Sequence, residues 1–311
     1  MNNSNPNALA KKQTFSVAIS TESYQNLIRN TLKDPDRANS FIASITSAVA
    51  TTPALQTCEP SSILAGGLLG EALKLSPSPQ LGQYYLVPFK QKAKYDREGR
   101  LLSPECSKAQ FVLGYKGYVQ LALRSAQYKD IDCMEIRQGE YLGKDPETAK
   151  PRFRFIEDDD LRESLPIVGY MAYFEYSTGF RKCIYWSKEK MLRHADTYSM
   201  AFSREAYEKM QNGQIPQKDM WKYSSFWYKD FDGMAKKTLL RQLISKWGIM
   251  STEIQKALVT DTGVPMIDKQ TGEIIAEPEL TFEEPVQQPV IESSTPASDP
   301  GEAEQIDLNS L

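Results

Sequence analysis

The sequence predicts an α+β fold, with N-terminal helices, a small antiparallel sheet that contains a hairpin, and C-terminal helices. Three observations support this prediction. Apolar residues recur at helical spacing before residue 76, β-branched and aromatic runs follow up to residue 186, and helical spacing returns after residue 187. The chain has 311 residues and is 41% hydrophobic, which is enough to bury a substantial core.

Three helices are expected at the start of the folded part. Residues 23–32 form the first, residues 37–51 form the second after a break at Pro35, and Pro60 begins the third. Three glycines lie within this third helix: Gly66, Gly67 and Gly70. Because glycine lowers helix propensity, we expect these positions to allow close packing against another backbone.

The central region is expected to form the sheet. Five runs have strand-like composition: residues 84–89, 110–114, 131–137, 152–156 and 167–176. Pro88 inside the first run predicts an edge strand or the arm of a hairpin. The turn at residues 177–179 predicts that 167–176 pairs with 180–186 as a hairpin.

Further helices are expected after the hairpin. Ser187 is typical of an N-cap and predicts a helix that runs to Tyr198. A short helical stretch follows near residues 204–211, and one long helix is expected over residues 220–247.

The composition changes near Val259, after which Pro, Glu, Gln and Ser are frequent and large apolar residues are few. Such a segment cannot bury enough apolar surface to offset the entropy of ordering it. We therefore expect a flexible N-terminus over residues 1–22, a folded core over 23–258, and an acidic disordered tail over 259–311.

The net charge of −3 averages two opposite regions. Residues 83–250 carry a net charge of +7, whereas residues 251–311 carry −11. This asymmetry favours a polyanion-binding body with a separate solvated appendage. The appendage could compete with the polyanion for this body, bind a partner protein or simply improve solubility.

The signatures of several enzyme classes are absent from the sequence. There is no P-loop pattern and no G-x-S-x-G motif, and His194 is the single histidine. The acidic run Glu157-Asp158-Asp159-Asp160 could bind a metal, but a solvated loop between strands is the simpler interpretation. We therefore expect no catalytic residue, no metal and no cofactor. The four cysteines are too far apart for a zinc knuckle and are expected to be reduced thiols in a cytoplasmic protein.

Basic residues alternate with aromatic residues in four places, which favours binding of single-stranded nucleic acid. Cations neutralise phosphates, and aromatic rings stack on bases. The first place holds Lys90, Lys92 and Lys94, which share one face if the chain is extended. An edge strand that lysines protect from aggregation is the alternative.

The second place holds Tyr115 and Lys116 between Gly114 and Gly117, followed by Arg124. The glycines would let a ring and a cation approach a nucleotide closely. The alternative is an ordinary strand-to-helix turn with a half-buried tyrosine.

The third and fourth places lie on expected helices. The third begins at Lys188 and has one cationic stripe of Lys190, Arg193 and His194. In the fourth, three lysines recur every seven residues: Lys222, Lys229 and Lys236. A second row on this helix holds Lys237 and Arg241. A solvated basic face is the alternative for the third place, and much of the aromatic content of the fourth belongs to a core.

Four segments resemble the RecT family of phage and prophage single-strand DNA annealing proteins. They read YLVPF at residues 85–89, QFVLGYKG at 110–117, WSKE at 186–189 and MAKKTLLR at 234–241. The resemblance covers roughly residues 20–250. It implies ATP-independent pairing of complementary strands in homologous recombination. It also implies a homo-oligomer, a ring or a helical filament, that binds single-stranded DNA and the annealed duplex and acts beside a partner exonuclease. A host single-strand-binding protein is a further possible partner.

The resemblance also implies roles for individual residues. Lys90, Lys92 and Lys94 would lie near the DNA groove, and Lys236, Lys237 and Arg241 would contact phosphates. The residues expected to line the groove are Tyr115, Lys116, Lys188, Lys190 and Arg193. The expected DNA-binding set is completed by Arg124, His194 and Lys229.

Two other functions remain open at this point. One is a single-stranded nucleic-acid-binding protein that does not anneal strands. The other is a metal-dependent nuclease that uses the acidic run with Arg152 and Arg154.

Overall fold

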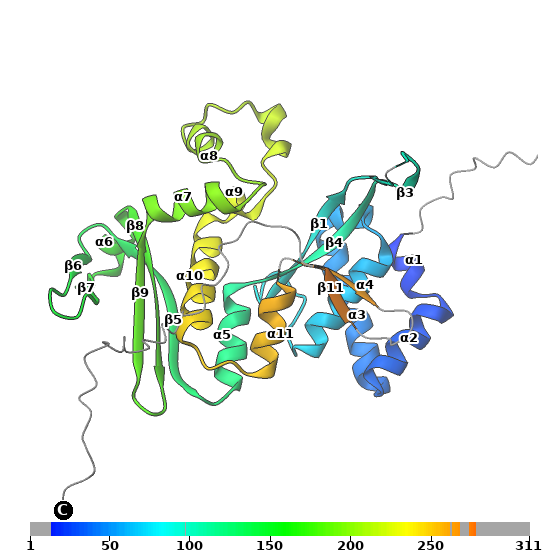
Figure 1. Ribbon diagram of the computed structural model, residues 1–311, viewed down its shortest axis with the longest axis horizontal. Coiled ribbons are helices and arrows are strands. Elements are labelled where there is room, and N and C mark those ends of the chain that lie inside the picture. Colours follow the sequence, from blue (N-terminus) through cyan, green and yellow to red (C-terminus); the bar gives the residue numbers. More distant parts are fainter. Residues whose placement is uncertain (1–13, 97, 262, 268–273, 278–311) are drawn as a thin grey trace, which may run out of the picture.

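The computed structural model describes residues 14–96, 98–261, 263–267 and 274–277. Its elongated body has helices α1 to α4 at one end and the sheet β5–β8–β9 towards the other, with α5, α10 and α11 between them (Figure 1). A single apolar core continues from the N-terminal helices to α11. The predicted α+β class is confirmed.

The N-terminal helices are α1 (Phe15–Ile19), α2 (Glu22–Leu32), α3 (Pro35–Thr51), the 3-10 helix η1 (Pro53–Thr57) and α4 (Pro60–Ala72). Asp34 caps α3, because its carboxylate accepts the backbone N–H groups of Asp36 and Arg37. Most of α4 is buried, in line with its apolar sequence. The three expected helices are confirmed.

The sequence suggested that the glycines of α4 pack against another backbone. They face side chains instead. A Cβ on Gly66 would lie 2.5 Å from a side-chain carbon of Leu86, and one on Gly70 would lie 2.3 Å from the ring of Tyr84. Gly66 and Gly70 therefore make room for large side chains of β1, and Gly67 does the same for Phe41 and Ile45 of α3.

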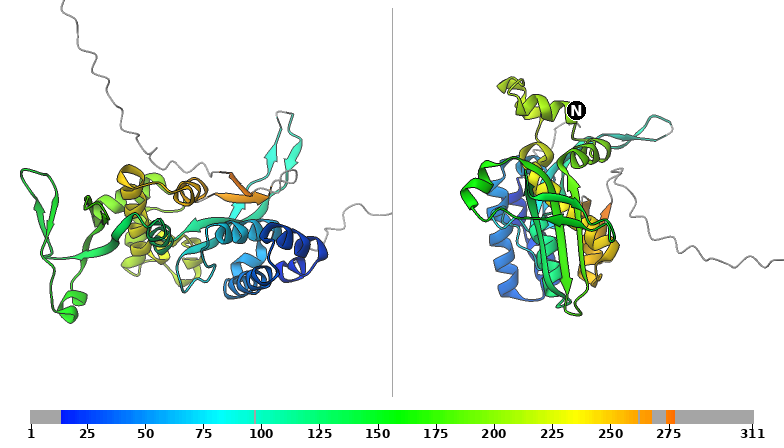
Figure 2. Two further views of the ribbon diagram at one scale, coloured as in Figure 1. Left: turned by 90° about the horizontal axis from the view of Figure 1, so that it is seen from below. Right: turned by 90° about the vertical axis from the view of Figure 1, so that its left-hand side faces the viewer.

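The first β-structure follows α4. Strand β1 (Tyr84–Gln91) pairs antiparallel with β4 (Cys106–Leu113), and β2 (Lys94–Tyr95) pairs with β3 (Leu101–Ser103). The β2–β3 pair projects from the body as an arm (Figure 2). The predicted hairpin arm is confirmed, but residues 92–93 interrupt it, so Lys90, Lys92 and Lys94 do not lie on one continuous strand.

The main sheet is antiparallel and has the order β5 (Tyr128–Arg137), β8 (Ile167–Tyr176), β9 (Arg181–Ser187). The predicted β8–β9 hairpin is confirmed, with Glu175 opposite Arg181. One face of the sheet packs on α10, where the hydroxyl of Tyr170 donates to the carboxylate of Asp232. A second arm leaves the end of β5 and contains β6 (Tyr141–Lys144), β7 (Pro151–Phe153) and α6 (Asp159–Ser164).

The C-terminal helices are α7 (Lys188–Tyr198), α8 (Arg204–Gln211), the 3-10 helix η2 (Gln217–Lys222), α9 (Phe226–Lys229), α10 (Phe231–Trp247) and α11 (Thr252–Thr260). The helices expected after Ser187 and near 204–211 are confirmed. The prediction of a single long helix over 220–247 is wrong, because the segment is divided into η2, α9 and α10. Ser225 caps α9 by accepting the N–H of Trp227, and Asp230 caps a new helix by accepting the N–H of Gly233.

The break has a consequence for the fourth basic cluster. Lys222 lies in η2, Lys229 ends α9, and Lys236 lies in the second turn of α10. These three lysines therefore do not form one seven-residue row on a helix.

The folded part extends beyond both ends of the expected core of residues 23–258. Helix α1 precedes it, and a hairpin of β10 (Val264–Ile267) and β11 (Ile274–Glu277) follows it and packs on α4. The backbone N–H of Phe111 also donates to the carbonyl of Gly263, at 2.9 Å. Most of the expected tail, residues 278–311, lies outside the described residues, as do residues 1–13 of the expected flexible N-terminus.

A buried carboxylate, Asp261, connects this C-terminal segment to the core. It accepts hydrogen bonds from the Lys237 ammonium at 2.9 Å, the Leu113 backbone N–H at 2.8 Å and the Tyr118 hydroxyl at 3.0 Å. The Arg241 guanidinium lies 3.4 Å from its second oxygen. Asp261 thereby joins α10, β4 and α5.

We expect Asp261→Ala to lower the free energy of unfolding by about 3–5 kcal/mol, because it leaves the Lys237 ammonium buried without its carboxylate. Urea unfolding monitored by fluorescence measures this value. The exposed Asp130→Ala provides the matched control.

The contacts of Asp261 and of the β10–β11 hairpin also predict the effect of truncation. A chain ending at residue 258 should be less stable than one ending at residue 277, and both lack residues 278–311. Equal stability of the two truncated chains would contradict the role of Asp261 and the β10–β11 hairpin.

A second buried carboxylate, Glu140, holds the β6–β7 arm. It accepts hydrogen bonds from the side chain of Arg162 at 2.6 and 3.2 Å, and from the backbone N–H groups of Arg137 and Ile156. Burial raises the pKa of Glu140, but the Arg162 guanidinium and the two N–H groups lower it by more, so the pKa lies below its usual 4.5.

Glu140→Gln should destabilise the protein near neutral pH, because it removes the charge that these donors favour. A carboxylate with a lowered pKa contributes stability above its unfolded-state pKa and loses it as the pH falls through the folded-state value. The difference in urea midpoint between wild type and variant should therefore narrow below about pH 4.3. Glu147→Gln in the same arm is the control, and a difference that does not depend on pH would contradict this assignment.

Candidate nucleic-acid interface

Residues from three of the four basic–aromatic segments meet where β1, α5, α9 and α10 come together. We call them the tyrosine–lysine cluster: Tyr85, Tyr115, Lys116, Phe226 and Lys236. The rings of Tyr85 and Phe226 lie 5.0 Å apart, and the Lys236 ammonium lies 4.8 Å from the centre of the Tyr115 ring. A Cβ on Gly82 would lie 3.1 Å from the Tyr85 hydroxyl and 3.5 Å from Cδ of Lys116, so these side chains are neighbours.

Two glycines position the start of α5 in this cluster. A Cβ on Gly114 would lie 2.1 Å from the carbonyl oxygen of Gly82, and one on Gly117 would lie 2.2 Å from that of Gln83. The glycines therefore allow the chain before β1 to pack directly on α5. Their effect in this structure is to hold Tyr115 and Lys116 beside Tyr85. The close approach of this ring and cation to a nucleotide stays a prediction.

Lys236 acts mainly as a buried support for Tyr115. Its ammonium pairs with Glu135 at 2.7 Å, and the side chain is 16% exposed. Burial lowers the pKa of Lys236, but the hydrogen bond and charge of Glu135 raise it by more, so the net shift is upward. The lysine therefore remains charged, and its cation fixes one face of the Tyr115 ring.

Tyr115 is half-buried, whereas Lys116 is exposed on the first turn of α5. The partial positive charge of a helix N-terminus adds to that of Lys116. The cluster thus presents the exposed ammonium of Lys116 beside aromatic rings, the combination that a phosphate and a stacked base require.

A second row of alternating rings and cations lies along α7. We call it the α7 row: Trp186, Lys190, His194 and Tyr198. The Lys190 ammonium lies 4.0 Å from the centre of the Trp186 ring. The His194 ring lies 5.2 Å from that of Trp186 and 4.7 Å from that of Tyr198. Ser187 starts the helix by accepting the backbone N–H of Lys190.

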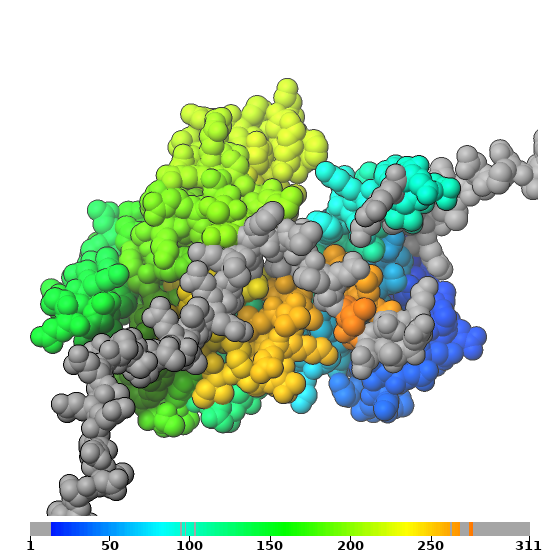
Figure 3. Space-filling model, in the orientation of Figure 1, coloured from blue at the N-terminus to red at the C-terminus, as the bar shows by residue number. Residues whose placement is uncertain are grey.

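Side-chain contacts connect the two sets through α9 and α8. Phe226 of α9 lies against Tyr85, and the Tyr228 hydroxyl of the same helix accepts the backbone N–H of Ser203 at 2.7 Å. Arg204 at the start of α8 pairs with Glu189 of α7. In Figure 3 the outline of the molecule is notched between the α8–α9 region and the β1–β4 strands, and the contact between Tyr85 and Phe226 joins these two sides.

Comparison with known proteins identifies the family. The model of the RecT family matches residues 39–273, which is most of the chain. The chain belongs to the RecT family.

Two curated relatives agree with this assignment. Protein RecT of Escherichia coli is 26% identical over 235 residues, which are 74% of this chain and 73% of that protein. YqaK of Bacillus subtilis, described as uncharacterized, is 36% identical over 225 residues, which are 72% of this chain and 64% of that protein. The match thus spans less than two thirds of YqaK.

The RecT-like segments supply most of the tyrosine–lysine cluster and the first residue of the α7 row. Tyr85 belongs to YLVPF, Tyr115 and Lys116 to QFVLGYKG, Trp186 to WSKE, and Lys236 to MAKKTLLR. The resemblance recognised in the sequence is confirmed. Phe226, Glu135 and Asp261 were not in the expected set. Only the fold shows that Lys236 and Lys237 are withdrawn from solvent, and such lysines need acidic partners, here Glu135 and Asp261.

The remaining expected DNA-binding residues are dispersed. Lys90 and Lys92 are exposed at the base of the β2–β3 arm, and Lys90 is five residues from Tyr85, or about 17 Å along β1. Lys94 lies in β2, and its side chain is outside the described set. Lys188 is half-buried and Arg193 exposed on α7; Lys229 is exposed at the end of α9.

The resemblance implied that Lys237 and Arg241 contact phosphates, but in this structure both side chains face the internal carboxylate of Asp261. The Lys237 side chain is 5% exposed and paired with Asp261, so its ammonium cannot reach a ligand on the surface. Arg241 is 21% exposed and lies against the same carboxylate. Both belong to the internal network that joins α10 to the C-terminal segment.

Arg124 also has a structural contact. Its guanidinium donates to the carbonyl oxygens of Leu73 and Lys74, at 2.8 and 2.7 Å, and so completes the C-terminal end of α4.

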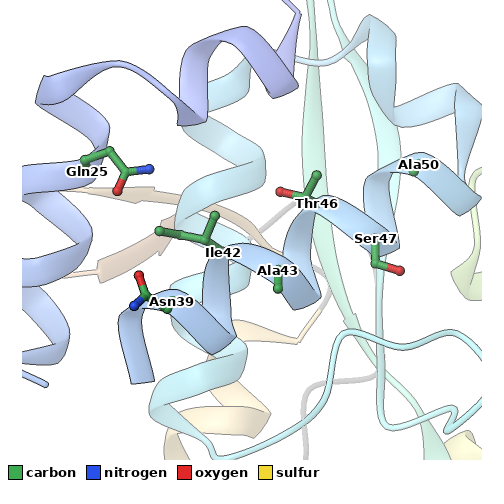
Figure 4. Close-up of a pocket in the computed structure, with 7 residues that line it drawn as sticks. All are labelled: Gln25, Asn39, Ile42, Ala43, Thr46, Ser47 and Ala50. Atoms are coloured by element: carbon green, nitrogen blue, oxygen red, sulfur yellow. The ribbon is translucent and has the colours of Figure 1, made fainter. Parts of the chain in front are cut away.

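Two other features of the structure do not resemble a ligand site. Asp158 of the acidic run caps α6 by accepting the N–H of Leu161, so the run begins a helix and does not form the expected inter-strand loop. Among the described residues, no three His, Cys, Asp or Glu side chains are grouped to hold a metal ion. The outer side of α3 carries an open depression lined by uncharged side chains from Gln25 to Ala50 (Figure 4), which offers no cation to a phosphate.

Arg124→Ala distinguishes a DNA contact from a structural one. We expect it to lower the free energy of unfolding by about 1.5–3 kcal/mol, because two carbonyl oxygens lose a charged donor. The affinity for single-stranded DNA, measured by fluorescence anisotropy on the folded variant, should not change. Weaker DNA binding at unchanged stability would restore the role that the sequence suggested.

Proposed function

We propose that this protein binds single-stranded DNA and pairs complementary strands without ATP, in homologous recombination. Membership of the RecT family is the observation that carries the proposal, because the resemblance implies this activity. The geometry supports it by bringing cations and rings from separate segments into the tyrosine–lysine cluster and the α7 row.

These two sets suit a single strand better than a duplex. A single strand offers unstacked bases, and each base can stack on a ring whatever its identity. Tyr85, Tyr115 and Trp186 supply rings, and Lys116 and Lys190 supply exposed cations. A helix in a major groove needs a row of polar side chains on one exposed face, whereas most side chains of α10 are buried or half-buried.

The pairing step needs no nucleotide if the protein removes the main barrier. Two phosphate backbones repel each other, and bound cations both screen this repulsion and release counterions. Base pairing then supplies the free energy. Strands held with their bases exposed meet more often in a productive register, and this accounts for acceleration without an ATPase.

The wider biological setting is part of the proposal. The resemblance implies a homo-oligomer, a partner exonuclease that supplies the single strand, and action in the cytoplasm of a bacterial host on phage or prophage DNA. Among the described residues, none of the helices combines the length and apolar character needed to cross a membrane.

Substitutions in the tyrosine–lysine cluster test the proposal. Tyr115→Ala should weaken binding of a labelled oligonucleotide by about 1–3 kcal/mol, because a stacking ring is lost. Lys116→Ala should weaken binding for all sequences and reduce the slope of affinity against salt concentration by about one. Lys246→Ala, at the exposed far end of α10, is the matched control.

A pairing assay separates this function from its alternatives. Two complementary oligonucleotides with donor and acceptor dyes should pair faster with the protein than without it, in the presence of EDTA. Binding without acceleration would indicate a non-annealing single-strand-binding protein. Magnesium-dependent cleavage that Asp159→Ala abolishes would indicate a nuclease.

A further inference from the structure

Large apolar side chains are exposed on the β2–β3 arm. Tyr95 is 62% exposed, Leu101 55% and Leu102 68%. Exposed Lys90 and Lys92 lie at the base of this arm. We call these five residues the arm surface. Leu101 shares a face of the arm with its partner Tyr95, whereas Leu102, the next residue of the strand, points to the other face. Exposed apolar groups on a projecting hairpin mark a contact with another macromolecule.

A second exposed surface lies on the opposite arm. Phe155 is 46% exposed and Leu161 of α6 is 52% exposed. The acidic run lies between them in the chain, and all four of its side chains are exposed. We call residues 155–161 the α6 surface. It is fixed in place, because Glu140 binds both Arg162 and the backbone of Ile156.

The two surfaces have opposite charges and lie at different ends of the molecule. The arm surface offers ammonium groups beside apolar side chains, and the α6 surface offers carboxylates beside apolar side chains. Figures 1 and 2 show that the β2–β3 arm and the β6–β7–α6 arm extend from opposite halves of the elongated body. They therefore cannot meet within one chain.

We propose that the arm surface of one copy docks on the α6 surface of the next copy. The carboxylates of the α6 surface repel phosphates, so this surface is unsuited to nucleic acid. A contact between two different surfaces at opposite ends is heterologous, and it propagates into a ring or an open filament. The proposal rests on the oligomeric assembly in the proposed function and names the surfaces that form it.

This contact also assigns Lys90 and Lys92 to the subunit interface, away from the DNA groove. A lysine that pairs with a neighbouring subunit contributes to assembly in the absence of DNA. Complementary charge at the rim of an apolar contact selects the partner and its orientation.

Charge reversal tests the contact in the full-length protein without DNA. We expect Asp159→Lys with Asp160→Lys, and separately Lys90→Glu with Lys92→Glu, to reduce the assembled fraction about ten-fold or more, as measured by mass photometry. All four side chains are exposed, so folding should be preserved. Asp130→Lys with Asp132→Lys makes the same charge change on β5 and should leave assembly intact.

Restoration is the decisive step. An equimolar mixture of the two reversed variants has complementary charges at every contact and should assemble again, as should a chain carrying all four substitutions. Leu101→Ser with Leu102→Ser should also reduce assembly. Mixing this variant with a charge-reversed variant should not restore assembly, because the apolar side chains are still missing.

Each outcome decides the proposal. Unchanged assembly in the reversed variants, no restoration on mixing, or a wild-type chain that stays monomeric with and without single-stranded DNA would overturn it. Restored assembly without strand pairing would instead count against the proposed function and leave the subunit contact standing. Normal strand pairing, together with assembly that the reversed charges do not affect, would overturn the subunit contact and leave the proposed function standing.

Discussion

The buried carboxylate of Asp261 is the constraint on which the arrangement of this molecule depends. A lysine and an arginine on α10 cannot be buried without a compensating charge, and the chain supplies that charge from a segment after α11. The same oxygens accept the N–H of Leu113 and the hydroxyl of Tyr118. Helix α10 is thereby held against the end of β4 and the start of α5.

That constraint positions the candidate interface. Leu113 immediately precedes the glycine that starts α5, so fixing it also fixes Tyr115 and Lys116. Lys236 and Lys237 are neighbours on α10 and point about 100° apart. One is drawn inward to Asp261 and the other towards Glu135, where its cation lies over the Tyr115 ring. The internal ion pair and the tyrosine–lysine cluster therefore lie on two different faces of α10.

Local structure could be predicted from the sequence, because caps and periodic patterns act within a few residues. Ser187 and the turn after Tyr176 both lie where the sequence placed them. The class of ligand could also be predicted, since cations and rings alternate in four segments. The individual contacts could not. Two lysines adjacent in sequence have opposite environments, and only the fold shows that Asp261, far along the chain, neutralises one of them.

The distribution of exposed charge separates two roles that the sequence presented as one. A basic surface for DNA needs exposed cations beside aromatic rings, and Lys116 beside Tyr115 meets that condition. A surface for another protein copy needs apolar area with charges that match a partner, and the two arms meet that condition with opposite signs. Because the arms lie away from the tyrosine–lysine cluster, subunits joined through them would leave the cluster of each copy open. Successive clusters could then bind one strand along the assembly, so the two surfaces are compatible in one particle.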